Sequence, residues 1–222
     1  MGLRELKKER TRQLIADTAW RLFADRGFDR VAVADVARAA EVSEATVFNY
    51  FRTKEDLFYF RFEQYEAQLI DAVRTRAAGE PALTAFRRAV LQGGGLLAKV
   101  ATGDRDALRQ LQTINRMIAE SPTLLARERR AMSQATDALA ELIATDLGRS
   151  GDPVSAAVAA SALIGVHRAV IDYVRRRVLS DDHMDRLARD VRRVTRRAFG
   201  LLENGLGDYA RSPSPVRPGG SK

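Results

Sequence analysis

Cysteine is absent from the 222 residues, and histidine occurs only twice, at His167 and His183. Without cysteine the chain has no disulfide framework, no thiolate metal site and no cysteine nucleophile. The two histidines fall in different predicted helices, and a metal site or a catalytic triad normally needs more converging ligands. The acidic pair Asp181-Asp182 is better explained as a helix cap than as an acid–base couple. The composition therefore predicts no catalytic site, no metal and no cofactor.

Long apolar runs are also missing, since no stretch approaches the roughly 20 residues that cross a bilayer. Charged residues begin at Arg4, so we expect neither a transmembrane helix nor a signal peptide, and a cytoplasmic protein. What is present is 45% hydrophobic and 30% charged residues, the balance of a globular chain. The formal net charge of +8 favours a polyanionic partner such as nucleic acid. A GC-rich genome is an equal alternative explanation of the arginine excess.

Apolar residues recur at helical spacing through nearly the whole chain, and the period-two alternation of strands does not occur. This spacing predicts a first helix over residues 5–26, which Gly27 ends. Short helices follow over 34–40 and from Ser43, and a longer one runs from Thr53 to about Ala78. Turn-forming dipeptides separate the later helices, the last two of which are predicted over 153–179 and 182–202.

The predicted helices divide the chain into a unit of short helices, residues 1–52, and a bundle of long helices, residues 53–207. The tail 208–222 is rich in Pro, Gly and Ser and is predicted to be disordered. We therefore expect an all-α fold. An N-terminal three-helix helix-turn-helix DNA-binding domain is followed by a C-terminal helical-bundle domain for ligand binding and dimerisation.

Residues 33–51 have the pattern of a helix-turn-helix, in which two short helices flank a tight connection at Glu41-Val42. Val47 and Phe51 point inward, so the opposite side of the second helix carries aromatic groups that are costly to leave in water. Apolar groups meet thymine methyls, asparagine pairs with adenine, and hydroxyl groups and helix N-termini bind phosphate. The predicted DNA-binding residues are Glu44, Ala45, Thr46, Phe48, Asn49, Tyr50, Thr53 and Lys54.

The stretch from Leu14 to Phe58 resembles the TetR family of transcriptional regulators, over about the first quarter of the chain. The matching motifs are Ala19-Trp-Arg-Leu-Phe23, Gly27-Phe28, Val33-Ala-Asp-Val-Ala37, Val42-Ser43, Ala45-Thr-Val-Phe-Asn-Tyr-Phe51 and Lys54-Glu-Asp-Leu57. The resemblance implies a homodimer whose C-terminal domain binds a small effector that weakens, or sometimes enables, DNA binding. It places the family's DNA contacts on Thr46, Phe48, Asn49, Tyr50 and Lys54.

Three residues depart from the family pattern. Glu41 stands where the turn usually has Gly, so we expect strain or a different shape there. Ala32 stands where a capping Thr is common, which forfeits about 1 kcal/mol of helix stability. Phe48 stands where Tyr is frequent, and it cannot donate a hydrogen bond to phosphate.

Aromatic residues recur along the long helix that begins at Thr53, and a cavity between bundle helices is the default place for a ligand. Core packing explains most of these residues individually. The predicted pocket residues are Phe62, Phe86, Gln112, Asn115, Met117, Met132 and His167. Because most of these side chains are apolar, they predict a small, largely apolar effector, whereas a core or interface role is the alternative for His167.

Small residues dominate the helix predicted over 153–179, which allows close contact across a two-fold interface that also includes the final helix. The predicted partners are double-stranded palindromic operator DNA, a small-molecule effector and a second copy bound through the last two long helices, with no membrane. A helical enzyme and a non-specific architectural DNA binder are the alternative functions. DNA contact and a solvated helix end are equal alternatives for the basic residues Arg4, Lys7, Lys8, Arg10 and Arg12.

Overall fold

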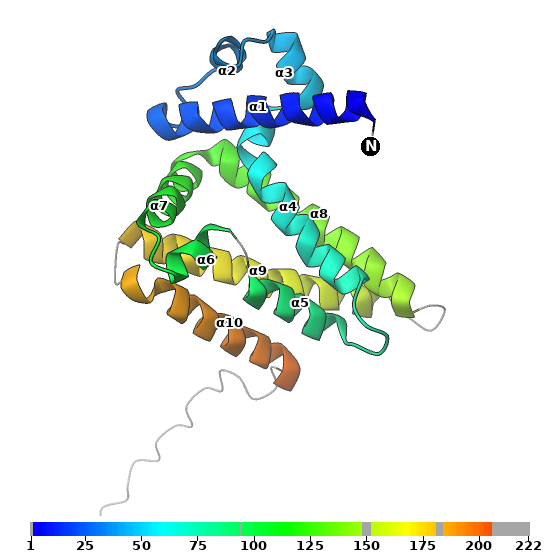
Figure 1. Ribbon diagram of the computed structural model, residues 1–222. Helices are drawn as coiled ribbons and strands as arrows, with labels where there is room; N and C mark the ends of the chain where they lie inside the picture. Colours follow the sequence, from blue (N-terminus) through cyan, green and yellow to red (C-terminus); the bar gives the residue numbers. More distant parts are fainter. Residues whose placement is uncertain (1, 94, 148–151, 181–183, 206–222) are drawn as a thin grey trace, which may run out of the picture.

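The computed structural model describes residues 2–93, 95–147, 152–180 and 184–205, and within these ranges it contains helices and no strand. The prediction of an all-α fold is confirmed. Figure 1 shows a small unit of α1, α2 and α3 set on a larger bundle, with α4 beginning at the unit and running into the bundle. The predicted tail 208–222 and His183 lie outside the described residues.

The N-terminal unit consists of α1 (Leu3–Arg26), α2 (Val33–Ala39) and α3 (Glu44–Tyr50). Gly27 ends α1 with a φ of 83°, and its N–H donates to the Phe23 carbonyl at 2.8 Å. Ser43 caps α3, because its Oγ accepts a hydrogen bond from the Thr46 amide at 3.0 Å. The helices share one buried core in which Phe23, Val36 and Val47 are at most 1% exposed. Local signals in the sequence thus fix both the ends of these helices and the faces that they bury.

Two of the family departures are visible in this unit. Glu41 occupies the turn between α2 and α3 with a φ of 55°, the left-handed region that favours glycine. Ala32 precedes α2 without a side-chain cap. The Asp35 carboxylate accepts from the Ala32 amide at 3.0 Å, which supplies half of a capping arrangement. The turn therefore forms with a glutamate at the cost of backbone strain.

The bundle consists of α4 (Lys54–Arg74), α5 (Ala82–Gln92), α6 (Leu96–Ala101), α7 (Arg105–Glu120), α8 (Pro122–Leu147), α9 (Pro153–Ser180), a 3-10 turn (Met184–Arg186) and α10 (Leu187–Asn204). Helix α4 ends at Arg74, short of the expected Ala78, and Thr75 and Arg76 donate side-chain hydrogen bonds to the carbonyls of Asp71 and Val73 at its last turn. The last helix begins at Leu187 and not at 182, because the 3-10 turn precedes it.

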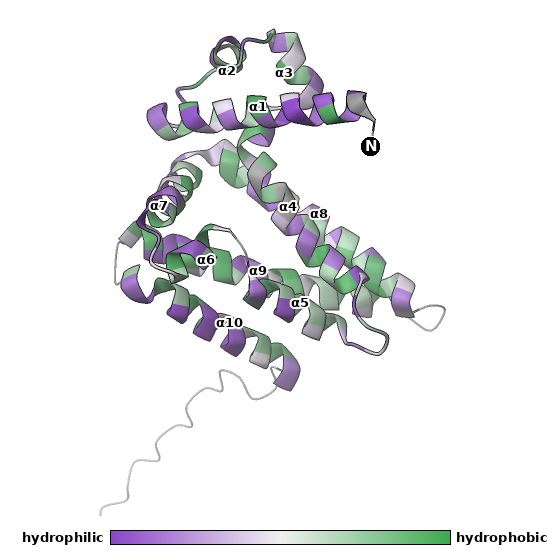
Figure 2. Cartoon of the chain, in the orientation of Figure 1, coloured by the Kyte–Doolittle hydropathy of each residue, from purple (hydrophilic) through white to green (hydrophobic). Residues whose placement is uncertain are grey.

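The bundle core joins helices that are far apart in the sequence. Phe86 of α5, Leu139 of α8 and Phe199 of α10 are 0% exposed and pack in one cluster with Leu69 of α4 and Leu163 of α9. Figure 2 shows hydrophilic and hydrophobic residues alternating along α10, which buries one side and leaves arginines on the other. Each bundle helix is held by its apolar side, the usual arrangement for helices on a shared core.

Helix α9 is long and apolar enough to cross a membrane by length and composition, a test that the core helix of a soluble protein also passes. The expectation that no apolar run approaches this length is corrected, because α9 carries no Asp, Glu or Lys and one Arg between Pro153 and Val170. Only 33% of its most apolar window is buried within this chain. Much of the apolar surface of α9 is therefore left open.

Candidate DNA interface and effector pocket

Helix α3 presents one side to the core and the other to solvent. Val47 is 1% exposed and Phe51, which follows the helix, is 3% exposed, so these two residues hold α3 against α1. Phe48 is 50% exposed, and Asn49 is also exposed. The predicted outward positions Glu44 and Ala45 are exposed as well. An exposed phenylalanine beside an asparagine is a surface suited to base edges in a major groove.

Thr46 and Tyr50 lie at the edge of the buried side of α3. Tyr50 is half-buried and packs against the N-terminal core, and the Thr46 hydroxyl lies 2.8 Å from the Ser43 hydroxyl. The expectation that both residues face fully outward is corrected, because they flank Val47 and are four residues apart on a two-turn helix. Each side chain keeps partial exposure.

The start of α4 is tied to the loop between α1 and α2. Lys54 Nζ donates to the carbonyls of Phe28 and Val31, each at 3.1 Å, and lies 4.3 Å from the centre of the Phe28 ring. Thr53 is exposed, and its Oγ1 accepts from the Asp56 amide at 3.1 Å. Lys54 thus stabilises the contact between α4 and this loop, a role that the sequence did not indicate. An ammonium group has three N–H donors, so one is left beyond these two bonds.

The basic residues near the N-terminus belong to α1. Arg4, Lys7, Lys8 and Arg10 are exposed on this helix, so both alternatives given for them stay open. Arg12 differs, since its guanidinium lies 4.4 Å from the centre of the Phe60 ring and 5.5 Å from that of Phe51. Arg12 therefore packs over the joint between α3 and α4.

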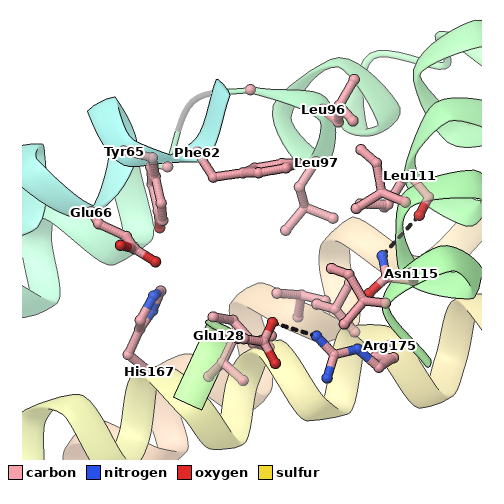
Figure 3. A pocket seen from close by; sticks show the side chains of 18 of the residues that line it. Phe62, Tyr65, Glu66, Leu96, Leu97, Leu111, Asn115, Glu128, His167 and Arg175 are labelled. Atoms are coloured by element: carbon pink, nitrogen blue, oxygen red, sulfur yellow. Dashed lines mark hydrogen bonds and ion pairs between the residues drawn. The ribbon is translucent and has the colours of Figure 1, made fainter. Parts of the chain in front are cut away.

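A cavity of about 580 Å³ lies in the bundle, between α4, α7 and α9 (Figure 3). Its walls are mainly aromatic and aliphatic, and they include side chains from α1, α6, α8 and α10. The volume falls in the range of cavities that enclose a drug-sized molecule. The cavity is thus a candidate effector site inside the bundle.

The structure brings together part of the predicted pocket. Phe62, Asn115, Met132 and His167 line the cavity. Phe86, Gln112 and Met117 do not, which corrects their assignment. Phe86 is fully buried in the bundle core, edge-on to His167. On α7 the lining residues are 110, 111, 114, 115 and 118, so Gln112 and Met117 are rotated off that face.

Many lining residues were not expected from the sequence, and three of them matter most for the function of the cavity. Trp20 comes from α1, so the N-terminal unit itself contributes to the cavity wall. Glu128 of α8 and Arg175 of α9 form an ion pair at 2.6 Å whose side chains are 16% and 12% exposed. Arg175 follows His167 by eight residues, and residues at this spacing lie on nearly the same face of a helix. The sequence could therefore have indicated Arg175 once His167 was chosen. Trp20 offered none, because only the tertiary structure places α1 over the bundle.

Burial controls the ionisation of the groups in the cavity wall. Burial lowers the pKa of His167 to about 4, so the imidazole is neutral near pH 7. Its Nδ1 is buried and has no hydrogen-bond partner. Burial also raises the pKa of Tyr65, and burial with the nearby Glu128 carboxylate raises that of Tyr59. These three side chains are therefore uncharged.

Polar bonds join the start of α8 to the loop between α1 and α2 and to α4. The Ser121 hydroxyl donates to the Asp29 carboxylate at 3.0 Å. Arg127 Nε donates to the Asp56 carboxylate at 3.0 Å, and the Tyr59 hydroxyl donates to the Leu124 carbonyl at 3.1 Å. Since Tyr59 also lines the cavity, one side chain connects the cavity wall with this contact.

The fold and the two sites define a two-domain helical protein with an N-terminal helix-turn-helix and a cavity in its C-terminal bundle. Residues 15–59 match the family model described as bacterial regulatory proteins, tetR family. Residues 80–207, more than half of the chain, match the model of the MftR C-terminal domain. The chain belongs to the TetR family, as its motifs predict.

Curated relatives are transcriptional regulators. HTH-type transcriptional regulator TcmR of Streptomyces glaucescens is 29% identical over 149 residues, which are 66% of this chain and 65% of TcmR. HTH-type transcriptional regulator LuxR of Vibrio harveyi is 48% identical over 58 residues, 23% of this chain and 28% of LuxR. The matched parts thus span less than two thirds of these relatives.

A solved structure has a similar fold. NalD, the secondary repressor of the MexAB-OprM multidrug efflux pump in Pseudomonas aeruginosa, aligns with a TM-score of 0.51 at 21% identity. The alignment covers 86% of this chain and 96% of NalD. This likeness supports the fold.

Proposed function

We propose that the protein is a dimeric transcriptional repressor that leaves a palindromic operator when a small, largely apolar effector fills the bundle cavity. The observation that carries this proposal is the pairing of an outward-facing α3 with a cavity whose wall includes α1 and α4. Its relatives are transcriptional regulators. The protein then acts by binding and not by catalysis, in the cytoplasm and without a membrane.

Helix α3 enters the major groove, and the start of α4 contacts the phosphate backbone. Asn49 and Phe48 meet base edges there, because they are exposed and project from the side of α3 opposite Val47. The proposed interface consists of Glu44, Ala45, Thr46, Phe48, Asn49, Tyr50, Thr53 and Lys54. The two copies of α3 in a dimer reach half-sites about 34–36 Å apart, one turn of DNA.

Replacing Asn49 with alanine tests this interface. The loss of one bidentate contact to adenine costs about 1–3 kcal/mol, so operator affinity falls at least about fivefold. Asn204→Ala is the matched control, since Asn204 is exposed at the far end of α10. Both variants are compared by fluorescence anisotropy on an operator selected from random DNA. Unchanged affinity of Asn49→Ala with an intact fold overturns the proposed base contact.

A second copy covers the open face of α9. Val154 and Val158 are 67% and 62% exposed, and Ala157 and Ser161 beside them are exposed small residues. A contiguous apolar helix face of this kind marks a protein interface. With α10 next to it, the same face on two copies forms a four-helix bundle about a two-fold axis.

Val158→Glu tests the dimer, because it places two charges at the proposed axis. We expect monomers in analytical ultracentrifugation and loss of tight binding to the palindrome. Leu14→Glu is the control for oligomeric state, since Leu14 is 50% exposed on α1, away from α9. A dimer that withstands Val158→Glu contradicts this interface.

An occupant of the cavity reaches the DNA-binding unit by two routes. It touches Phe62 on α4, which three residues separate from α3, and it touches Trp20 on α1. Tyr59 adds a link to the contact at Leu124. An effector releases DNA only if it binds the two conformations with different affinity, so it must favour the arrangement in which the α3 helices no longer fit two grooves.

Two alternative functions give different results in the same assays. A non-specific architectural DNA binder binds random DNA nearly as well as the selected palindrome at fixed salt concentration. A helical enzyme turns over a substrate, loses that activity on His167→Gln, and shows no specific DNA binding. Specific competition by the palindrome contradicts both.

A further inference from the structure

The cavity wall is apolar except at a few places. Phe62, Tyr65 and Leu97 are among its aromatic and aliphatic residues. Figure 3 shows His167 of α9 facing Tyr65 and Glu66 of α4 on one side, and the Glu128–Arg175 pair farther along α9. These polar groups determine which chemical groups a ligand in the cavity needs.

His167 is a hydrogen-bonding group held without a partner. It is 4% exposed, and its Nδ1 makes no hydrogen bond. Its ring packs against Tyr65 at 5.9 Å and Phe86 at 6.4 Å between ring centres, so the side chain is fixed in place. Burying an unpaired nitrogen destabilises a fold, and a well-packed bundle has no structural reason to keep one. Since the ring lines the cavity and its Nδ1 is closed off by the protein, a ligand in the cavity can hydrogen-bond to the part of the imidazole that faces the cavity.

The charges at the wall disfavour an anion. Glu66 and Glu128 bring two carboxylates to the cavity. Arg175 adds a cation that is bound to Glu128 at 2.6 Å and lies 3.6 Å from Asp172, although its buried Nε has no hydrogen-bond partner. His167 adds no positive charge, because burial lowers its pKa to about 4. Lys99 is at the cavity rim and exposed, where water screens it. An anionic group deep in the cavity would lose its hydration beside carboxylates.

We propose that the effector is an uncharged, mostly aromatic molecule with a hydroxyl group that hydrogen-bonds to the His167 imidazole. A hydroxyl group both donates and accepts, so it fits either tautomer of a neutral imidazole. The aromatic walls at Phe62, Tyr65 and Trp20 match flat rings. This inference rests on the proposed function, since it names the chemistry of the effector for the same cavity.

Three probes of matched shape test the inference: 2-naphthol, naphthalene and 2-naphthoate. They are titrated into the full-length wild-type protein at pH 7 by isothermal calorimetry. We expect 2-naphthol to bind about tenfold more tightly than naphthalene, the contribution of one hydrogen bond to a buried partner. We expect 2-naphthoate to bind more weakly than both.

The variant His167→Phe tests whether His167 causes the preference for 2-naphthol over naphthalene. It keeps an aromatic ring and removes both nitrogens, so naphthalene still binds and the advantage of 2-naphthol disappears. Met132→Leu is the matched control, an apolar exchange in the same wall that keeps the advantage. If His167→Phe does not fold, 2-methoxynaphthalene replaces it as a test on the wild type, because methylation removes the O–H donor and enlarges the group.

The outcomes separate the two proposals. Equal affinity for 2-naphthol and naphthalene in the wild type, or tightest binding of 2-naphthoate, overturns the uncharged hydroxylated effector and leaves the cavity as a ligand site. A preference that persists in His167→Phe overturns the role of His167. Binding of none of the probes contradicts the cavity as a site for aromatic effectors, and with it the effector part of the proposed function.

Discussion

The N-terminal unit is built around a buried core, whereas the bundle contains a cavity. In the unit, Phe23 and Val47 are buried in one core, and the proposed function lies on the outside of α3. In the bundle, a volume of about 580 Å³ stays open among side chains, and function lies inside. A recognition surface needs a rigid support, whereas an effector site needs space that a ligand can fill. The N-terminal unit therefore supports a surface for binding, and the bundle leaves space for a ligand inside.

Identical truncations in the two regions test this contrast, and they have the largest expected effect. Phe23→Ala empties a site that is 0% exposed and lowers the free energy of unfolding by about 3–5 kcal/mol. Phe62→Ala removes a half-buried ring that borders open volume, so it costs about 1–2 kcal/mol. Urea unfolding followed by circular dichroism measures both. Equal losses would show that the cavity wall is packed as tightly as the core.

The pH dependence of stability probes the cavity side. The unfolded chain protonates His167 near pH 6.5, but burial lowers the folded-state pKa to about 4. Between these values the unfolded state binds more protons, so stability falls as the pH decreases. From pH 7 to pH 4, the wild type should lose up to about 3 kcal/mol more than His167→Gln does. Parallel pH profiles of the two proteins would place the imidazole in contact with water.

Backbone strain at Glu41 probes the other side of the comparison. Because its φ is 55°, Glu41→Gly relieves strain and should raise the free energy of unfolding by about 1 kcal/mol. Glu41→Ala is the control, since it removes the carboxylate but keeps a Cβ, and it should bring no gain. A gain with alanine equal to that with glycine would assign the effect to charge.

The missing cap at Ala32 gives the smallest expected effect. Ala32→Thr supplies a hydroxyl group for the first turn of α2, and stability should rise by about 0.5 kcal/mol. This is the low end for a cap, because Asp35 already bonds to the Ala32 amide and its own amide reaches the Ala32 carbonyl at 3.1 Å. Thermal unfolding detects the change, and Ala32→Val is the matched control without a hydroxyl group.

The two regions also differ in how far the sequence predicted them. In the N-terminal unit, helical spacing placed Val47 and Phe51 inward and Phe48 outward, as the structure shows. The prediction that Tyr50 faces outward was partly wrong, because that ring lies at the edge of the buried side of α3. The side of α3 on which each residue lies follows from its place in the helical repeat, so a local pattern contains this information.

For the cavity, the sequence supplied suitable residue types but did not say which of them meet. His167 and Phe62 line it, whereas Phe86 is packed behind the wall and Met117 faces the N-terminal unit. The rotation of each helix about its own axis depends on all its neighbours, and an apolar side chain fits a core or a cavity equally well. Local periodicity cannot make that choice.

The sequence by itself determined that the chain is all-α, that it belongs to the TetR family, and which side of α3 faces outward. These follow from helical spacing, caps and turn residues, which act over a few positions. The tertiary structure alone decided that Trp20 of α1 lines the bundle cavity, that Glu128 pairs with Arg175, and that Lys54 ties α4 to the α1–α2 loop. Those contacts join distant segments, and only the packed arrangement of the helices creates them.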